Sequence, residues 1–329
     1  MEEMGKKKGK LLAAGVISMI LLLIAGCSEK KQEPELKQAL KPQFVSGGIR
    51  SVSLKKGGEE FLRISRVPEE YKMSFDYWEV LNPYDENMTV DTEAMFQMFE
   101  ALSSLSFDTP VKAAEDTDTG LQDSDMGFTV DYVDTLDASS AQKADEPDTR
   151  VEVILGKEDG KGGRYAAVSG NKEQIYLLPE AALMMIYEKE PFDYLLKIPV
   201  LISADTLKKI EITAGGVRYD LAVDTKRDVY KLGKKEAGKK EFAALYQKLA
   251  GIMLVSETEG ERRGEKEEAE LTINFRRNTK GAPDVQVSYY PYDETYDSVR
   301  INGKEWFLVR REDVAELAEE IEKACGINR

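Results

Sequence analysis

Residues 174–186 read QIYLLPEAALMMI, a short apolar strand followed at once by a proline and an apolar helix. Pro179 is suited to the first turn of such a helix, because its missing N–H has no partner there. Residues 305–325 read EWFLVRREDVAELAEEIEKAC, which predicts the same order of strand and helix. A turn containing glycine, Gly170-Asn171 or Asn302-Gly303, stands just before each strand. These two endings indicate that one plan occurs twice in the chain.

The sequence upstream of each ending also follows one pattern. In the first half, strands are expected at 52–54, 61–64 and 72–78, a helix at 91–105, and further strands at 128–133, 151–155 and 164–168. In the second half, strands are expected at 208–213, 217–223 and 228–232, a helix at 239–252, and further strands at 271–275, 285–290 and 298–301. We therefore predict an α+β fold of two similar repeats, each an antiparallel meander sheet packed by amphipathic helices.

Apolar spacing indicates which side of each helix is buried. Asp91 is a helix-capping residue, and Met95, Phe96, Phe99 and Leu102 are expected to share the buried face of the helix that follows. The helix at 239–252 repeats this spacing. The apolar connector 191–202 separates the halves, so we place the first repeat at 49–190 and the second at 191–329.

The first residues have the three parts of a secretory signal in order. Four lysines within residues 6–10 precede the uncharged stretch LLAAGVISMILLLI at 11–24, and then come Ala25, Gly26 and Cys27. This ending resembles the lipobox of bacterial lipoproteins, in which the cysteine thiol takes a diacylglycerol before cleavage. We expect a lipoprotein signal peptide at 1–26, a lipid-anchored flexible tether at 27–48, and structured sequence from about Ile49.

Lipidation of Cys27 would hold the protein on the extracytoplasmic face of the cell membrane, because two acyl chains anchor a protein stably. The alternative is an uncleaved N-terminal anchor with an incidental cysteine. In either case the partner of the N-terminus is membrane lipid.

Composition excludes several kinds of function. The chain has 46 Lys and Arg against 61 Asp and Glu, and without residues 1–26 the balance is 42 against 59. This acidic balance argues against a nucleic-acid partner, which needs clustered positive charge. The sequence contains no histidine, so Ser-His-Asp and Cys-His catalysis and histidine-type zinc sites are excluded. With Cys27 lipidated, Cys325 has no disulfide partner, and its place on an apolar helical stripe indicates a core thiol.

Several short motifs in the first half resemble the family grouped as domain of unknown function 4340. They are Trp78 with Pro83, Gly120-Leu121, Ile154-Leu155-Gly156, Arg164-Tyr165 and Gln174–Leu178. The chain differs where a proline often follows Gly-Leu, and its insert at 134–148 lengthens one hairpin. The resemblance implies a membrane-tethered envelope protein, in some genomes encoded beside ABC-type transporter components, and it brings no catalytic residues.

Four other segments have both a functional and a structural interpretation. The acidic loop Glu115–Asp125 has oxygen ligands for calcium but lacks the spacing of an EF-hand, so a solvated loop is the other interpretation. Pro-Tyr-Asp-Glu occurs at 83–86 and 291–294, either as paired carboxylates or as turns. Tyr289, Tyr290, Tyr292 and Tyr296, with Trp306 and Phe307, form either core or a binding face. The glycine-rich stretch 156–163 lacks the continuation of a phosphate-binding loop and predicts a hairpin turn.

These observations favour a non-catalytic interaction or scaffold module of the cell envelope that serves a membrane transporter and needs no cofactor. The alternative is a ligand-binding lipoprotein with a sugar or peptide cleft between the two repeats. An enzyme that uses Asp and Glu alone is the third hypothesis.

Overall fold

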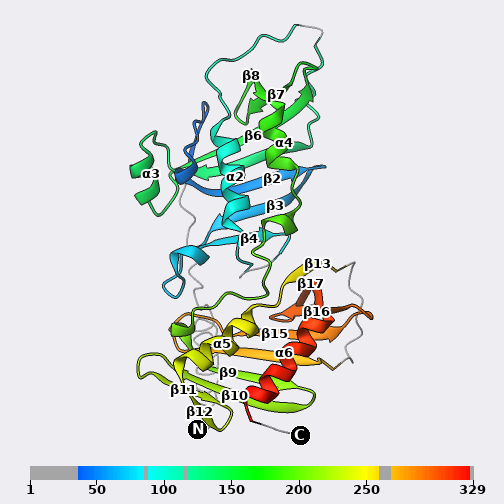
Figure 1. Ribbon diagram of the computed structural model, residues 1–329. Helices are drawn as coiled ribbons and strands as arrows, with labels where there is room; N and C mark the ends of the chain where they lie inside the picture. The colour runs from blue at the N-terminus through cyan, green and yellow to red at the C-terminus, as the bar shows by residue number, and fades with distance from the viewer. Residues whose placement is uncertain (1–35, 85–87, 115–116, 259–267, 327–329) are drawn as a thin grey trace, which may run out of the picture. The chain divides into compact units, whose positions relative to one another are not determined.

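The computed structural model describes residues 36–84, 88–114, 117–258 and 268–326. Cys27 and the predicted signal peptide lie outside these residues. Two β-sheets, one from each half of the chain, form the framework of the described structure (Figure 1).

The first sheet has eight strands, and β1 pairs parallel to β6 while the others run in the order β4-β3-β2-β5-β6-β7-β8 with antiparallel neighbours. Its strands are β1 (Lys37–Gln38), β2 (Ile49–Lys56), β3 (Glu59–Arg66), β4 (Trp78–Asn82), β5 (Met126–Tyr132), β6 (Thr149–Glu158), β7 (Gly163–Val168) and β8 (Asn171–Pro179). Its helices are α2 (Thr92–Ser103), α3 (Ala138–Lys143) and α4 (Glu180–Tyr187).

The second sheet has nine strands in the order β12-β11-β10-β9-β14-β15-β16-β17-β13. They are β9 (Leu207–Ala214), β10 (Val217–Asp224), β11 (Val229–Leu232), β12 (Lys235–Ala237), β13 (Leu254–Glu257), β14 (Leu271–Arg277), β15 (Val285–Pro291), β16 (Tyr296–Ile301) and β17 (Lys304–Arg310). Helices α5 (Lys239–Ala250) and α6 (Arg311–Ala324) accompany this sheet. Short 3-10 turns, η1 (Ser46–Gly48), η2 (Ser74–Asp76), η3 (Pro191–Tyr194) and η4 (Ala204–Thr206), complete the described elements.

The two sheets share one connectivity. Strands β2 to β4 precede helix α2 in the first half, and strands β9 to β12 precede helix α5 in the second. A later strand then pairs beside the first strand of each set, β5 on β2 and β14 on β9, and in the second half β13 comes before β14. Three more antiparallel strands and a final helix, α4 or α6, complete each half. The predicted fold class, α+β with two similar meander sheets, is confirmed, whereas the exact repeat boundaries stay a prediction.

The helix predictions in the first half are confirmed with one correction. Asp91 caps α2, and its side chain accepts hydrogen bonds from the backbone N–H groups of Glu93 and Ala94. The buried stripe of α2 follows helical spacing through Met95, Phe99 and Leu102. Phe96 was expected on this face but is 48% exposed, because it follows Met95 by one residue and so lies about 100° around the helix from the buried stripe. Its ring contacts that of Phe99 in an edge-to-face arrangement.

The strand expected at 72–78 is wrong, because strand β4 begins only at Trp78. Residues 74–76 instead form the 3-10 turn η2, in which Asp76 accepts a hydrogen bond from the backbone N–H of Met73 at 2.6 Å. Short polar side chains of this kind compete with strand pairing by bonding to nearby backbone.

The segment before Ile49 is more structured than expected. Lys37 and Gln38 form β1 beside β6, and Phe44 is buried, with its ring 5.1 Å from that of Tyr132. The described structure therefore has ordered packing from Lys37, inside the stretch assigned to the tether. Burial of an aromatic ring removes a large apolar area from water and accounts for this early start.

Each half has an apolar core between its sheet and its helices. Figure 1 shows α2 and α4 over one face of the first sheet and α5 with α6 over one face of the second. Side chains alternate along a strand, so Leu54, Phe128 and Val153 enter the first core. Their neighbours point to the opposite face, which we call the open face of the first sheet.

Candidate functional site: a polar hollow on the first sheet

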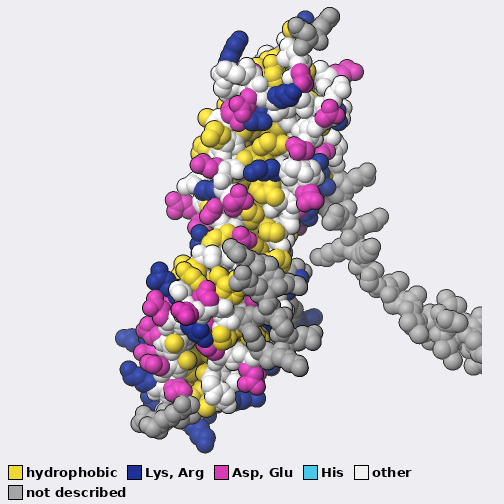
Figure 2. All heavy atoms as spheres, turned by 90° about the vertical axis from the view of Figure 1, so that its right-hand side faces the viewer, with side chains coloured by type: hydrophobic (Ala, Val, Ile, Leu, Met, Phe, Trp, Pro, Cys, Tyr) yellow, Lys and Arg dark blue, Asp and Glu magenta, His cyan; other side chains and the backbone are white. Residues whose placement is uncertain are grey.

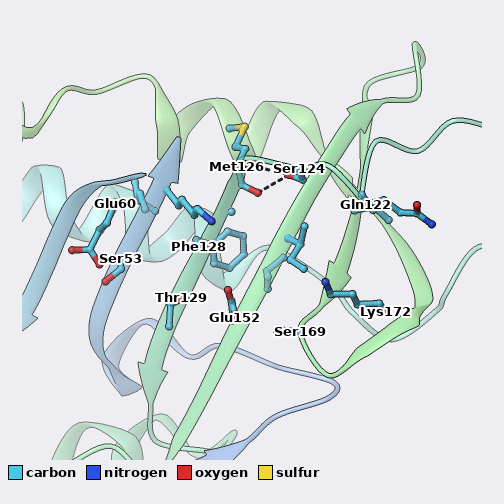
Figure 3. Close-up of a pocket in the computed structure, with 16 residues that line it drawn as sticks. Ser53, Glu60, Gln122, Ser124, Met126, Phe128, Thr129, Glu152, Ser169 and Lys172 are labelled. Carbon is cyan, nitrogen blue, oxygen red and sulfur yellow. Dashed lines mark hydrogen bonds between the residues drawn. The ribbon is translucent and has the colours of Figure 1, made fainter. Parts of the chain in front are cut away.

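The open face of the first sheet contains a hollow of about 320 Å³ (Figure 3). Four separate stretches of chain line it, namely 53–60, 121–129, 152–154 and 169–172. Figure 3 shows Ser53 and Glu60 on one side of the hollow and Lys172 on the other, with strands β5 and β6 crossing between them.

Strand pairing places the lining residues in rows across the sheet. Ser53, Thr129 and Glu152 form one row, because Ser53 pairs with Thr129 and Thr129 pairs with Glu152. In the next row, Lys55 pairs with Gly127. A row of this kind presents its side chains side by side on one face.

Two glycines inside strands allow the chain to pack closely around the hollow. A Cβ atom on Gly127 would lie 2.4 Å from the carbonyl oxygen of Val153, and one on Gly156 would lie 2.1 Å from the carbonyl oxygen of Thr119. The backbone of residues 119–121 therefore passes directly over Gly156, and Lys157 N–H donates to Thr119 at 2.8 Å. A glycine in a strand interior is the signal of such a close backbone approach.

Ser124 fixes the loop that borders the hollow. Its hydroxyl lies within hydrogen-bonding distance of the carbonyl oxygens of Met126 and Leu155, and it accepts a hydrogen bond from the N–H of Met126 at 3.2 Å. The loop is thereby attached to both β5 and β6. Gly120, at φ 68°, makes the turn that leads into it.

Arg164 ties the far wall of the site to helix α4. Its guanidinium donates to both carboxylate oxygens of Glu180, at 2.8 and 2.9 Å, to the Glu158 carboxylate at 2.8 Å and to the Gly156 carbonyl at 3.0 Å. The hydrogen bonds to Glu180, followed by the negative charges of Glu180 and Glu158, raise the pKa of Arg164. Because the fork is bidentate, Arg164 holds β6, β7 and α4 in one geometry.

Most polar side chains around the hollow are uncommitted. Within the described part of the chain, they make no side-chain hydrogen bond or ion pair, and they are Ser53, Lys55, Gln122, Thr129, Glu152, Ser169 and Lys172. Glu60 and Ser124 are the exceptions, since Arg63 pairs with Glu60 at 2.7 Å and the Ser124 hydroxyl bonds to the backbone of β5 and β6. The hollow therefore offers hydroxyl, amide, ammonium and carboxylate groups together.

The corresponding face of the second sheet has the opposite character. Glu211 at its centre is paired with Lys209, Arg218 and Arg276 at 2.9 to 3.1 Å. Its hydrogen bonds with Arg276 first, and then with Lys209, lower the pKa of the Glu211 carboxyl. Farther along the sheet, Asn274 bonds to Gln286 at 2.8 Å. These polar groups of the second sheet are therefore bonded to one another.

The acidic loop does not assemble ligands for calcium in the part that is described. Glu115 and Asp116 lie outside the described residues, and Asp118 pairs with Lys157 and accepts the N–H of Gly120. The pairing with Lys157 is the main reason that the pKa of Asp118 is lowered. Among the described residues, no group of three or more Cys, Asp or Glu side chains is placed to hold a metal ion.

The two Pro-Tyr-Asp-Glu motifs have different surroundings. In the first, Asp85 and Glu86 lie outside the described residues, and Tyr84 is buried with its hydroxyl donating to Glu257 at 2.6 Å. In the second, the Asp293 carboxylate accepts hydrogen bonds from the backbone N–H groups of Thr295 and Tyr296, both at 2.7 Å, and closes a turn.

The aromatic run divides between core and surface. Tyr289 and Phe307 are buried, whereas Tyr290 is partly exposed with Arg300 over its ring, and Trp306 packs on the ring of Tyr84 at 5.9 Å. The glycine-rich stretch 156–163 contains the turn between β6 and β7, as predicted.

Cys325 caps the C-terminal end of α6 and is half-buried against the core, so desolvation raises the pKa of its thiol to about 11.

Comparison with known proteins identifies a family for this chain. The model of a domain of unknown function (DUF4340) matches residues 78–272, which is more than half of the chain. The chain belongs to this family. The match begins at β4 and ends in β14, so it includes the lining residues of the hollow on β5, β6 and β8 but not those on β2 and β3. No curated protein and no solved structure matches. Among the described helices, none is both long enough and apolar enough to cross a membrane.

Sequence reasoning did not locate the hollow. Its walls come from segments separated by up to about a hundred residues, and only strand pairing brings them together. Gly127 and Gly156 lie inside the observed strands β5 and β6, but they fall just outside the strands predicted at 128–133 and 151–155. Gly156 was also assigned to the hairpin turn, so no local pattern marked the close backbone approach that these glycines allow.

Proposed function

We propose that this protein is a lipid-anchored, non-catalytic interaction module of the cell envelope, and that it binds its partner on the open face of the first sheet. The hollow of uncommitted polar side chains is the observation that carries the proposal. Cys27 supplies the anchor, and a membrane transporter subunit is the partner that the family resemblance leads us to expect.

The chemistry of the hollow supports binding rather than catalysis. Without histidine in the chain, acid–base work would depend on the carboxylates that line the hollow, Glu60 and Glu152. Glu60 is already engaged by Arg63, so one uncommitted carboxylate remains. Glycosidic hydrolysis needs two such groups acting together.

A sugar or peptide cleft between the two halves finds less support. The described pocket lined by residues from both halves, among them Tyr71, Glu79 and Arg277, has a volume of about 30 Å³. This is room for about one water molecule. The hollow on the first sheet is about ten times larger, and it is the better candidate for a binding site.

Two experiments in the native host test the proposal. Labelled fatty acid should enter the wild-type protein and not the Cys27→Ala variant. For the binding face, a photoreactive amino acid at position 129 should cross-link a partner that also co-purifies in gentle detergent. Thr129→Arg should abolish co-purification, because an arginine would occupy the hollow.

Thr213→Arg is the matched control, because Thr213 is an exposed threonine on the open face of the second sheet. It should leave co-purification unchanged. Loss of the partner in both variants, or in neither, would contradict the assignment of the first sheet as the binding face. Wild-type protein without fatty-acid label would contradict the anchor.

A further inference from the structure

The uncommitted groups around the hollow carry charges of both signs. Glu152 offers a carboxylate from β6, and Lys55 offers an ammonium from β2, with no ionic partner for either among the described residues. The hydroxyls of Ser53 and Thr129 lie in the same row as Glu152, and Lys55 lies in the next row. A ligand that pairs with both Glu152 and Lys55 carries an ammonium and a carboxylate, and polar groups between these ends would bond to the two hydroxyls.

We propose that the hollow binds a short zwitterionic peptide, with the peptide ammonium at Glu152 and its carboxylate at Lys55. This inference rests on the open face of the first sheet being the binding face, as proposed above, and it names the class of ligand.

The strand register gives the length of this peptide. Lys55 and Glu152 are separated by strand β5, which is two interstrand spacings or about 10 Å. Lys55 also lies two residues beyond Ser53, the residue in the row of Glu152, which adds about 7 Å along the strand. The two backbones are therefore about 12 Å apart. An extended tripeptide spans about 10 Å, and the lysine side chain covers the remainder.

The volume and the lining agree with this ligand. A hollow of about 320 Å³ is at the lower end of ligand pockets, which range over about 300–1,000 Å³. Between the charged ends, the hydroxyls of Ser53 and Thr129 and the amide of Gln122 are groups that hydrogen-bond to peptide N–H and C=O.

A saccharide fits the lining less well. Sugar rings are held in part by stacking on exposed aromatic faces. The aromatic residue that lines the hollow is Phe128, which is only 2% exposed and enters the core. A neutral sugar would also leave Glu152 and Lys55 without ionic partners.

Equilibrium dialysis of the full chain, purified from its host membrane in mild detergent, tests the inference. The probes are tritiated trialanine, N-acetyl-trialanine amide, which has the same backbone without the charges, and tri-N-acetylglucosamine. Trialanine should bind at least tenfold more tightly than either of the others. Glu152→Gln and Lys55→Gln should each weaken trialanine binding about tenfold, because each removes one charge-assisted contact.

Glu173→Gln is the matched control, since Glu173 is an exposed carboxylate beside Lys172 that does not line the hollow. It should bind trialanine as the wild type does. Absence of trialanine binding, equal binding of the capped peptide, or tighter binding of the saccharide would each overturn the inference. Any of these results, obtained while Thr129→Arg still abolishes co-purification of the partner, would refute the peptide ligand but not the assignment of the binding face.

Discussion

Gly156→Ala tests how the hollow is built. A Cβ atom at this position would lie 2.1 Å from the carbonyl oxygen of Thr119 and 3.1 Å from two side-chain atoms of Leu121. The first of these contacts is with backbone, so rotation of a side chain cannot relieve it. The loop over β6 must move, and the hydrogen bond from Lys157 N–H to Thr119 is lost with it.

The expected loss of stability follows from these contacts. Overpacking costs about 1–3 kcal/mol, and one lost hydrogen bond costs about 0.5–1.5 kcal/mol. Replacing glycine within a strand returns about 0.5–1 kcal/mol of backbone entropy. We therefore expect the free energy of unfolding to fall by about 2–3 kcal/mol.

The assay is urea unfolding followed by tryptophan fluorescence. The two tryptophans are Trp78 in the first sheet and Trp306 in the second, so a Trp306→Phe background reports the first sheet alone. Gly156→Ala should lower the urea midpoint without changing the slope. Hydrogen exchange of the Lys157 amide should also become faster.

Gly47→Ala is the matched control. Its nearest neighbour to a new Cβ is 3.9 Å away, which is ordinary contact, and its backbone is not in the left-handed region. This variant should be as stable as the wild type or more stable by about 0.4–1 kcal/mol. If Gly156→Ala keeps the wild-type urea midpoint and Lys157 exchange rate, the close approach of the loop to β6 is wrong.

Three further predictions concern other parts of the chain. Lys72 and Glu79 form a nearly buried ion pair at 2.5 Å, with side chains 7% and 5% exposed, so Lys72→Met should lower the free energy of unfolding by about 3–5 kcal/mol in urea titrations. The double variant Lys72→Met/Glu79→Leu should recover most of the lost free energy of unfolding. A double variant no more stable than Lys72→Met would contradict the role of the unpaired Glu79 carboxylate. Ion pairing lowers the pKa of Glu211 in the folded state. The stability that this carboxylate contributes is therefore present above its unfolded pKa and is lost as the pH falls through its folded pKa. Glu211→Gln should make the urea midpoint fall less steeply below about pH 4.5. Because its pKa is raised to about 11, Cys325 should resist a thiol reagent at pH 8 in the native protein, and in urea one thiol per chain should react if Cys27 is lipidated and two if it is not.

The helices and most strands were predictable because local patterns determined them. Asp91 before an apolar stripe at helical spacing gave α2, and Pro179 after an alternating strand gave α4. The repeated order of elements gave the two sheets.

Other features depended on contacts that no local pattern records. The insert at 134–148 was expected only to lengthen a hairpin, but it contains helix α3, and the buried guanidinium of Arg50 donates to the carbonyl oxygens of Ala141 and Ala144 at 2.6 Å there. Arg50 is about ninety residues away from α3 in sequence, so this short helix depends on a tertiary contact rather than on helix propensity.

The contrast between the two open faces is the main reason to assign binding to the first sheet. Exposed ion pairs such as those around Glu211 contribute only about 0–1 kcal/mol each, so the first sheet gives up little stability by leaving Glu152 and Lys55 unpaired. For binding, however, the difference is large. A ligand on the second sheet must first break existing pairs, whereas a ligand in the hollow replaces only water. Two sheets of one connectivity therefore differ in the availability of their polar groups, and that availability is what a binding face requires.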